Sequence, residues 1–338
     1  MKIWTTCHCS RFGVKFFLPV ILAVMFVIPY QGQAQEDPEE ILKAITKIRA
    51  TIPDNARTAK SLGTEREGNG VVIDSNGHIL TIGYLVIEAE TIEVSDPAGN
   101  VVKAINVGYD QSSGLGLLKT RTSLNVSPMK LGNSSEINVG DPVLVAGYGG
   151  VDAVQGATVI LRDEFTGYWE YLLEKAIFTT PPHRNYGGAA LIGRSGDLMG
   201  IGSLLTPVNV ESYGLVPCNM FVPIDLIKPI LADLILMGRS SRPPRPWLGV
   251  YAEEGHGRVF ITRVSSHGPA EKAGLKAGDI VLGVNDQDVK GLADFYRKVW
   301  GIGVSGVDVP LKILQGTRIK DIIVRSEDHF SYLRIQKE

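Results

Sequence analysis

The chain has 338 residues, of which 44% are hydrophobic and 21% are charged, and its formal net charge is −2. This length is enough for two or three domains with cores of ordinary size. A net charge so close to zero, without a basic stripe along the sequence, excludes a protein whose main partner is nucleic acid. The 38 glycines indicate many turns and favour a soluble, β-rich globular protein.

Residues 1–34 have the pattern of an export signal. Basic residues precede an apolar run over residues 16–30, and small residues at positions 32 and 34 come just before an acidic segment. This run is short for a helix that crosses a bilayer. We therefore expect cleavage after Ala34, with retention as an N-terminal anchor in the inner membrane as the alternative. In both cases the folded part is exported, and the periplasm is the compartment that we expect.

Cysteine and histidine are sparse in this chain. Cys7 and Cys9 lie in the signal, so Cys218 is the one cysteine of the mature chain. A single cysteine cannot form an intramolecular disulfide, and we expect it to be a core side chain. Neither a His-x-x-x-His nor a Cys-x-x-Cys spacing occurs, so the sequence supports no metal site and no cofactor.

Residues 35–60 are predicted to contain an amphipathic helix. Ile41, Leu42, Ile45 and Ile48 recur at helical spacing, and a proline and acids stand in the first turn. We expect this helix to pack on its own domain, with an oligomer contact as the alternative.

Residues 61–237 consist of short apolar runs separated by glycine and asparagine, which predicts many short strands in a sandwich or barrel. About 170 residues suits two six-stranded barrels packed together, closed by a short helix over residues 223–237. The expected strands include residues 70–73, 79–82, 91–94, 115–118, 143–146, 158–161 and 198–201.

Residues 238–246 are polar and proline-rich, as in a short stiff linker. Residues 247–338 then form a separate pattern of strands and helices. It contains a strand at residues 258–264, an amphipathic helix at 292–300 and two strands at 307–315 and 319–325.

Several motifs resemble those of the HtrA family, trypsin-fold serine proteases with a C-terminal PDZ domain. Gly68-Asn69-Gly70-Val71-Val72-Ile73 and Leu131-Gly132-Asn133-Ser134 are similar to stretches of the family's protease domain. Trp247-Leu248-Gly249-Val250 resembles the loop that opens its PDZ domain, and residues 268–281 match the helix and strand that follow. The resemblance implies a mainly β fold, with a trypsin-like double six-stranded β-barrel at residues 61–237 and a PDZ domain of α+β type at residues 247–338.

The same resemblance locates the catalytic triad. His183-Arg184-Asn185-Tyr186-Gly187-Gly188 is similar to the nucleophile loop and puts Tyr186 at the reactive serine. The stretch over residues 77–86 puts Tyr84 at the catalytic histidine, and the stretch over residues 110–119 puts Gly114 at the catalytic aspartate. Arg184 stands at the oxyanion-loop glycine, two residues before the nucleophile.

These replacements predict a pseudoprotease that is not an enzyme. A triad needs a nucleophile, a base within hydrogen-bond reach and an acceptor that orients the base. A phenol with a pKa of about 10 is a poor base at pH 7, and Gly114 has no side chain. Arg184 replaces the residue type that most easily adopts a positive φ.

Other serines and histidines are weaker candidates for a nucleophile or base. Ser195 is expected in a hairpin turn, and Ser112 and Ser113 are expected to be turn residues. His78 follows a hairpin-turn signal and is expected to be exposed, while His183 is expected in a surface loop.

PDZ domains bind a peptide as an added strand and hold its terminal carboxylate in a nest of backbone N–H groups. The resemblance assigns this loop to Trp247, Leu248, Gly249 and Val250, of which the last three provide the donors. The alternative is that this PDZ domain only packs against the barrels.

We therefore expect a non-catalytic HtrA-like protein of the cell envelope that binds C-termini or unfolded segments of proteins, as a chaperone, an adaptor or a regulator of an active HtrA-type protease. Two alternatives are a residual serine endopeptidase with a non-standard site and a barrel cleft that binds a ligand or metal. The resemblance implies a homo-oligomer, a trimer. A membrane contact is expected only if the N-terminal segment is retained.

Overall fold

A computed structural model describes residues 38–211 and 213–334. The predicted signal or anchor at residues 1–34 lies outside the described residues. None of the described helices has the length and apolar character that crossing a membrane requires.

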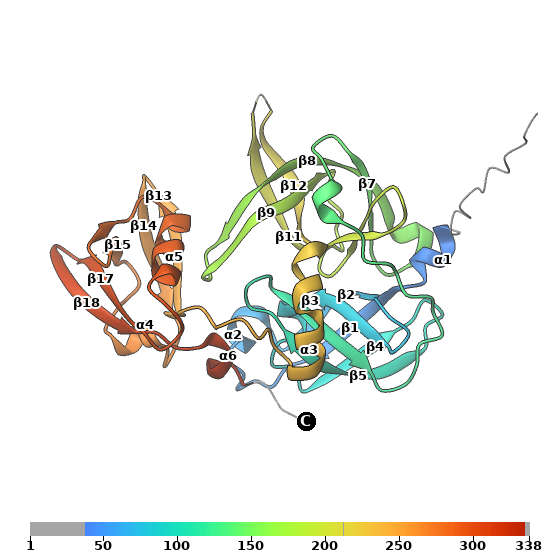
Figure 1. Cartoon of the computed structure of the whole chain (residues 1–338), viewed down its shortest axis with the longest axis horizontal. Coiled ribbons are helices and arrows are strands. Elements are labelled where there is room, and N and C mark those ends of the chain that lie inside the picture. The colour runs from blue at the N-terminus through green and yellow to red at the C-terminus, as the bar shows by residue number, and fades with distance from the viewer. Residues whose placement is uncertain (1–37, 212, 335–338) are drawn as a thin grey trace, which may run out of the picture. The chain divides into compact units, whose positions relative to one another are not determined.

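Residues 45–120 form a closed six-stranded barrel, in the strand order β1-β2-β3-β6-β5-β4. Figure 1 shows this barrel in blue to teal. Its inward-facing side chains, such as Ile48, Val71, Leu80 and Leu117, are fully buried. Alternating apolar residues on short strands produce this core, because successive side chains of a strand point to opposite faces. The strands are β1 (Ile45–Thr51), β2 (Glu65–Val72), β3 (His78–Ile82), β4 (Thr91–Ser95), β5 (Val101–Tyr109) and β6 (Leu115–Thr120).

The prediction of an amphipathic helix in residues 35–60 is wrong for most of these residues. Helix α1 (Pro38–Leu42) is short, and β1 already begins at Ile45. One further short helix, α2 (Ala59–Leu62), lies between β1 and β2. The segment of β1 is rich in isoleucine and threonine, whose branched side chains favour strands. β1 pairs with both β2 and β4 and so closes the barrel. The first barrel therefore includes residues that the sequence placed in a separate helix.

The second barrel is also closed and six-stranded, in the order β10-β11-β12-β9-β8-β7. The predicted pair of six-stranded barrels is thus confirmed. Cys218 is fully buried in this barrel, as expected, and its Sγ lies 2.9 Å from the carbonyl oxygen of Thr206. The strands are β7 (Pro142–Ala146), β8 (Val154–Gly167), β9 (Tyr171–Thr180), β10 (Ala190–Ile192), β11 (Leu198–Val210) and β12 (Gly214–Pro223).

Short helical turns connect these strands and end the barrel pair. The helix predicted over residues 223–237 is regular only in α3 (Leu231–Met237), which ends at Gly238 in the left-handed conformation. Two 3₁₀ turns precede it, η4 (Ile224–Leu226) and η5 (Lys228–Ile230). Three more lie in the loops: η1 (Gly83–Leu85), η2 (Ser134–Glu136) and η3 (Gly150–Ala153).

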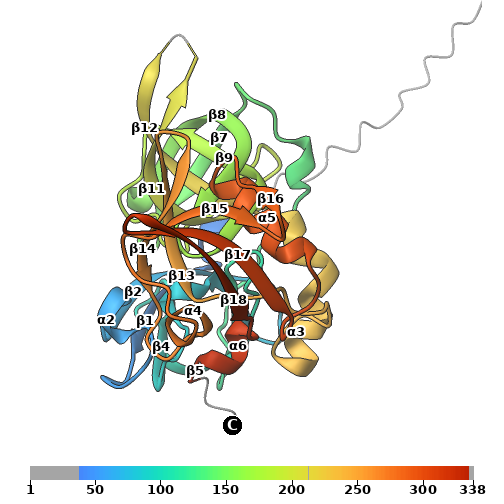
Figure 2. The same ribbon diagram turned by 90° about the vertical axis from the view of Figure 1, so that its left-hand side faces the viewer.

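The C-terminal region is a further sheet with helices, which faces the viewer in Figure 2. Its long strands run in the order β13-β14-β15-β17-β18, so β13 is an edge strand. Helix α5 buries Phe295, Tyr296 and Val299, and the predicted strand at residues 258–264 is confirmed. The elements are β13 (Val250–Gly255), β14 (Arg258–Val264), α4 (Pro269–Lys272), β15 (Ile280–Val284), β16 (Gln287–Asp288), α5 (Leu292–Gly301), β17 (Asp308–Gln315), β18 (Arg318–Arg325) and α6 (His329–Tyr332).

The segment after the last strand returns to the first barrel. The N–H of Arg334 donates to the Glu88 carboxylate at 2.8 Å, and the guanidinium of Arg57 lies 4.7 Å from the centre of the Tyr332 ring. Glu88 also accepts the backbone N–H groups of Arg57 and Thr58. These contacts tie the end of the described chain to the beginning of the barrel pair.

Candidate functional site

A cavity of about 490 Å³ is lined by residues of both barrels. The first barrel contributes Lys47, residues 67–69, Tyr84 and Leu85, and the second contributes Tyr148 and residues 184–187. The structure therefore brings two of the predicted triad positions, Tyr84 and Tyr186, into one cavity together with Arg184.

Tyr84 is held in η1 at the wall of this cavity. Its hydroxyl donates to the carbonyl oxygen of Ser203 at 2.9 Å. Burial, with a smaller effect from the neighbouring Tyr186, raises the pKa of Tyr84 well above its ordinary value. A Cβ added at Gly187 would lie 2.9 Å from the Tyr84 oxygen, so the phenol reaches the opposite loop. At neutral pH the Tyr84 hydroxyl therefore keeps its proton, donates a hydrogen bond and cannot act as a general base.

Asn69 fastens the loop of residues 184–187 to strand β2. Its side-chain amide donates to the carbonyl oxygens of Asn185 and Gly187, each at 2.9 Å. Its Oδ1 accepts the N–H of Tyr148 at 2.8 Å, and its own N–H donates to Gly187. The role of this positioning residue was not evident from the sequence. The one signal was an asparagine inside a stretch that otherwise predicts an apolar strand.

Gly114 lies next to the turn that carries Tyr84, because the N–H of Gly83 donates to the Gly114 carbonyl at 2.7 Å. It does not line the cavity. A Cβ at Gly114 would meet the Tyr171 ring at 3.3 Å, and the Tyr171 hydroxyl donates to the Ser113 carbonyl at 2.5 Å. Tyr171, which sequence reasoning did not identify, occupies the space beside this glycine.

The two histidines considered as bases are buried, so their predicted exposure is wrong. His78 starts β3, and its Nδ1 lies 2.6 Å from the carboxylate of Asp74, which also accepts its backbone N–H. These paired contacts fold the ring back into the protein. His183 is only 9% exposed because its N–H and carbonyl are both bonded to the side chain of Asn219. Neither ring lines the cavity.

The serines considered as nucleophiles also lie away from the cavity. Ser195 is in the turn between β10 and β11, as predicted, with its hydroxyl 2.8 Å from the Asp197 carboxylate. Ser113 is buried with its N–H bonded to Asp110. Among the described residues, no group of His, Cys, Asp or Glu side chains could hold a metal ion. The hydroxyls that line the cavity belong to tyrosines.

The predicted peptide loop of the C-terminal region has its backbone donors turned toward one carboxylate. The N–H groups of Leu248, Gly249 and Val250 donate to Glu170 at 2.9, 2.7 and 2.9 Å. Burial raises the pKa of Glu170 to about 7, although these three hydrogen bonds oppose the shift. Trp247 is not part of this nest, because its N–H donates to the carbonyl of Glu327. Glu170 itself was not predicted from the sequence.

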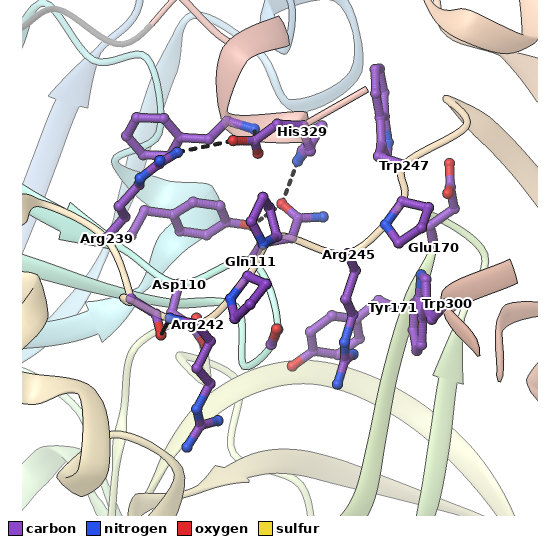
Figure 3. Close-up of a pocket in the computed structure, with 18 of the residues that line it drawn as sticks. Asp110, Gln111, Glu170, Tyr171, Arg239, Arg242, Arg245, Trp247, Trp300 and His329 are labelled. Atoms are coloured by element: carbon purple, nitrogen blue, oxygen red, sulfur yellow. Dashed lines mark hydrogen bonds and ion pairs between the residues drawn. The ribbon is translucent and has the colours of Figure 1, made fainter. Parts of the chain in front are cut away.

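A smaller cavity, of about 100 Å³, adjoins this contact (Figure 3). It is lined by the linker, by Glu170 and Tyr171, and by Trp247, Trp300 and His329. Figure 3 shows Glu170 beside Trp247 at the end of the strands that carry it. The guanidinium of Arg245 lies 4.3 Å from the centre of the Trp300 ring. The linker therefore lies against both the second barrel and helix α5 of the C-terminal region.

Two protein families match this chain. The trypsin-like peptidase domain matches residues 68–201, and the PDZ domain matches residues 246–325. The first range contains most of the residues that line the barrel cavity, all but Lys47 and Glu67, and the second contains the loop of backbone donors.

Proteins similar to this chain include serine endoproteases. The serine endoprotease DegS of Haemophilus influenzae is 32% identical over 252 residues, which cover 71% of this chain and 69% of the relative. A probable periplasmic serine endoprotease, DegP-like, of Pseudomonas putida is 27% identical, over 81% of this chain and 57% of the relative. The chain thus spans little more than half the length of the DegP-like relative.

Solved structures agree in fold. The HtrA-type protease AlgW with a tripeptide has a TM-score of 0.51 at 21% identity. The match includes 88% of this chain and 96% of the AlgW chain. The serine endoprotease from Yersinia pestis has a TM-score of 0.51 at 23% identity, with 86% of this chain and 98% of that chain covered. At these identities the likeness shows the fold alone, and it confirms the predicted trypsin-like barrels and PDZ domain.

The relatives contradict the prediction that the chain is not an enzyme. They are named serine endoproteases, and a trypsin-like peptidase domain matches the barrels. We correct that prediction: the class indicated by the comparisons is that of serine endoproteases. The residues at the predicted triad positions remain Tyr84, Gly114 and Tyr186.

Proposed function

Because the chain belongs to the HtrA family of trypsin-like serine endoproteases with a PDZ domain, we propose that its PDZ domain takes up C-terminal or unfolded segments of other proteins. The protein then acts in the cell envelope as a chaperone, an adaptor or a regulator of proteolysis. An active HtrA-type protease is the partner proposed for the last role. The periplasm is proposed as its compartment, since the residues 1–34 pattern is that of an export signal and relatives are named periplasmic.

The observation that carries this proposal is the convergence of three backbone N–H groups on one carboxylate. Leu248, Gly249 and Val250 donate to the two oxygens of a single carboxyl group within 2.9 Å. A nest of this kind suits the terminal carboxylate of a peptide. The neighbouring strand β13 lies at the sheet edge, where a peptide can add as a further strand.

A peptide-binding measurement tests the proposal. We expect residues 36–338 to bind a peptide with a hydrophobic last residue and a free carboxylate at micromolar affinity, about −8 kcal/mol, by fluorescence anisotropy. The same peptide with a C-terminal amide should bind at least tenfold more weakly, because the nest then lacks its anion. Equal affinities for the acid and the amide would contradict the proposal.

Peptide-bond hydrolysis in the barrel cavity is the second candidate, favoured by the names of the relatives. The protein hydroxyls that could react there are those of Tyr84, Tyr148 and Tyr186. Casein turnover by the chain, lost in Tyr186→Phe and kept in Tyr213→Phe at an exposed hairpin end, would assign hydrolysis to this cavity. Turnover that survives Tyr186→Phe would exclude the Tyr186 hydroxyl as the nucleophile.

Two further proposals concern the cavity and the assembly. The cavity is lined by Lys47, Glu67 and Arg184, which makes it polar enough for a charged ligand. Because the described residues offer no group that could hold a metal ion, metal analysis of the purified protein is expected to find none. The trimer implied by the family resemblance stays a prediction, and analytical ultracentrifugation of residues 36–338 measures it.

A further inference from the structure

The turn between β8 and β9 has an unusual residue at its end. The strands are joined by Tyr168-Trp169-Glu170, with Gly167 paired to Tyr171. Glu170 has φ +56, in the left-handed region. Three-residue hairpin loops place glycine most readily at this position. A glutamate here contradicts the local preference, and such contradictions are typical of positions held by contacts elsewhere.

Those contacts are all made by the PDZ domain. One oxygen of the Glu170 carboxylate accepts the N–H groups of Gly249 and Val250, and the other accepts the N–H of Leu248. Glu170 is 6% exposed, and no ion pair of its carboxylate with a lysine or arginine occurs among the described residues. The side chain thus stands in the place of a peptide's terminal carboxylate.

The backbone of the turn follows the peptide groove as well. The N–H of Ala252, on the edge strand β13, donates to the carbonyl of Tyr168 at 2.8 Å. Val250 and Ala252 are two residues apart, as are Glu170 and Tyr168. This is the register of an added strand, in which every second residue is bonded to the same neighbour.

Helix α5 holds the turn from the other side. The Tyr296 hydroxyl accepts the N–H of Glu170 at 3.1 Å and donates to the carbonyl of Gly167 at 3.0 Å. The turn is therefore bonded to β13 and to α5 at once. Since a PDZ domain binds its peptide against an edge strand, an external peptide and this turn need the same N–H groups.

We propose that Tyr168-Trp169-Glu170 is an internal ligand of the PDZ domain, and that an incoming peptide carboxylate binds by displacing the carboxylate of Glu170. The inference rests on the proposed peptide-binding function. It also specifies the ligand class: a free C-terminus with an aromatic residue two positions before the end. Tyr168 occupies that position, with its ring 6.1 Å from the ring of Tyr251 on β13.

An internal ligand lowers the apparent affinity of every external one, because only the fraction of molecules with an open groove can bind. The linked turn competes at a high effective concentration without any cost of association. Removing its carboxylate should therefore tighten external binding without adding a contact to the peptide.

The test compares variants of residues 36–338 by anisotropy with a fluorescein-labelled peptide ending in Gly-Tyr-Trp-Val. We expect Glu170→Gln and Glu170→Ala to lower the apparent Kd about tenfold or more. Glu174→Gln is the matched control, since this exposed glutamate lies on the same hairpin and has no place in the nest. Its apparent Kd should equal that of the unchanged chain.

Tyr296→Phe gives an independent arm if the Glu170 variants fold poorly, because it removes only the hydroxyl that bridges Glu170 and Gly167. It should lower the apparent Kd several-fold. Hydrogen exchange of residues 164–172 should rise when the peptide is added to the unchanged chain.

The outcomes separate the two proposals. Equal apparent Kd values for the unchanged chain, the Glu170 variants and Tyr296→Phe would overturn the internal ligand and leave the peptide-binding function standing. Failure of every folded variant to bind the free-acid peptide would overturn both.

Discussion

At the scale of single residues, the loop of the barrel cavity requires a glycine at position 188, because no side chain fits there. Gly188 has φ +75, and a Cβ there would lie 1.9 Å from the carbonyl oxygen of Asn69. Real Cβ atoms do not approach a backbone oxygen so closely. The same Asn69 supplies the side-chain bonds to the loop, so the close approach and the clamp belong to one arrangement.

Replacement of Gly188 by alanine should therefore destabilise the protein strongly. We expect a loss of about 3 kcal/mol or more in the free energy of unfolding, from backbone strain and overpacking together. Urea denaturation followed by circular dichroism measures it. Gly99→Ala is the control: φ is +86 but nothing lies within 4 Å of the added Cβ, so about 1 to 2 kcal/mol is expected. Similar losses for both variants would show that the contact with Asn69 is harmless.

The sequence identifies backbone donors where they belong to a local motif, and it does not identify residues whose position depends on a tertiary contact. The donors Leu248, Gly249 and Val250 followed from the loop motif. Glu170 lies 78 residues before the first of them, and no local pattern connects the two. The buried state of His78 and His183 likewise depends on Asp74 and Asn219 side chains, which the turn signals around those histidines do not reveal.

At the scale of elements, the sequence predicted the two barrels and the core strands and helix of the PDZ domain, and it failed at β1. The spacing of Ile41, Leu42, Ile45 and Ile48 fits a helix, but the last two belong to a strand. A short apolar run has no single period, and pairing with β2 and β4 decided the outcome. The strand predicted at residues 158–161 is longer in the structure, where β8 runs from Val154 to Gly167, because its end is stabilised by the PDZ domain and by the ring stack of Trp169 on Tyr171.

Docking of the β8–β9 turn should depend on pH. Burial raises the pKa of Glu170 from 4.5 to about 7 in the docked state. Docking is then linked to proton uptake: its stability is fully present below pH 4.5 and is lost as the pH rises through 7. The other titratable group that contacts Glu170 is Tyr296, whose pKa burial raises above its ordinary value, so it does not titrate in this window.

We therefore expect the apparent affinity for the free-acid peptide to increase several-fold from pH 6 to pH 8. The peptide's own terminal carboxyl starts from a lower pKa, about 3.5, and takes up fewer protons in the same nest. Anisotropy titrations across this range measure the effect, and Glu170→Gln should flatten the profile. An affinity that falls toward pH 8 in the unchanged chain would refute the linkage.

At the scale of the molecule, the barrels and the linker contact the PDZ domain and the segment after it at several places. The Glu170 carboxylate enters the loop of residues 248–250, Arg245 packs on Trp300, and the segment with Tyr332 and Arg334 returns to Glu88 of the first barrel. The first of these contacts consists of hydrogen bonds from the loop and from β13 to a single turn. Opening of this contact therefore requires no unfolding of either barrel.

Cys218 is the single thiol of the chain beyond residue 34, and its reactivity can be used to measure the unfolding of the second barrel. Cys218 is fully buried and lies against Thr206 of the adjacent strand, and burial raises its pKa to about 11. A thiol-specific reagent can react only after β11 and β12 separate, so its rate reports the opening of this barrel. We expect labelling of residues 36–338 by a chromogenic disulfide to be slow at pH 8, to accelerate with urea, and to keep the same rate in Glu170→Ala. Faster labelling in that variant would mean that the PDZ contact and the barrel core unfold as one unit.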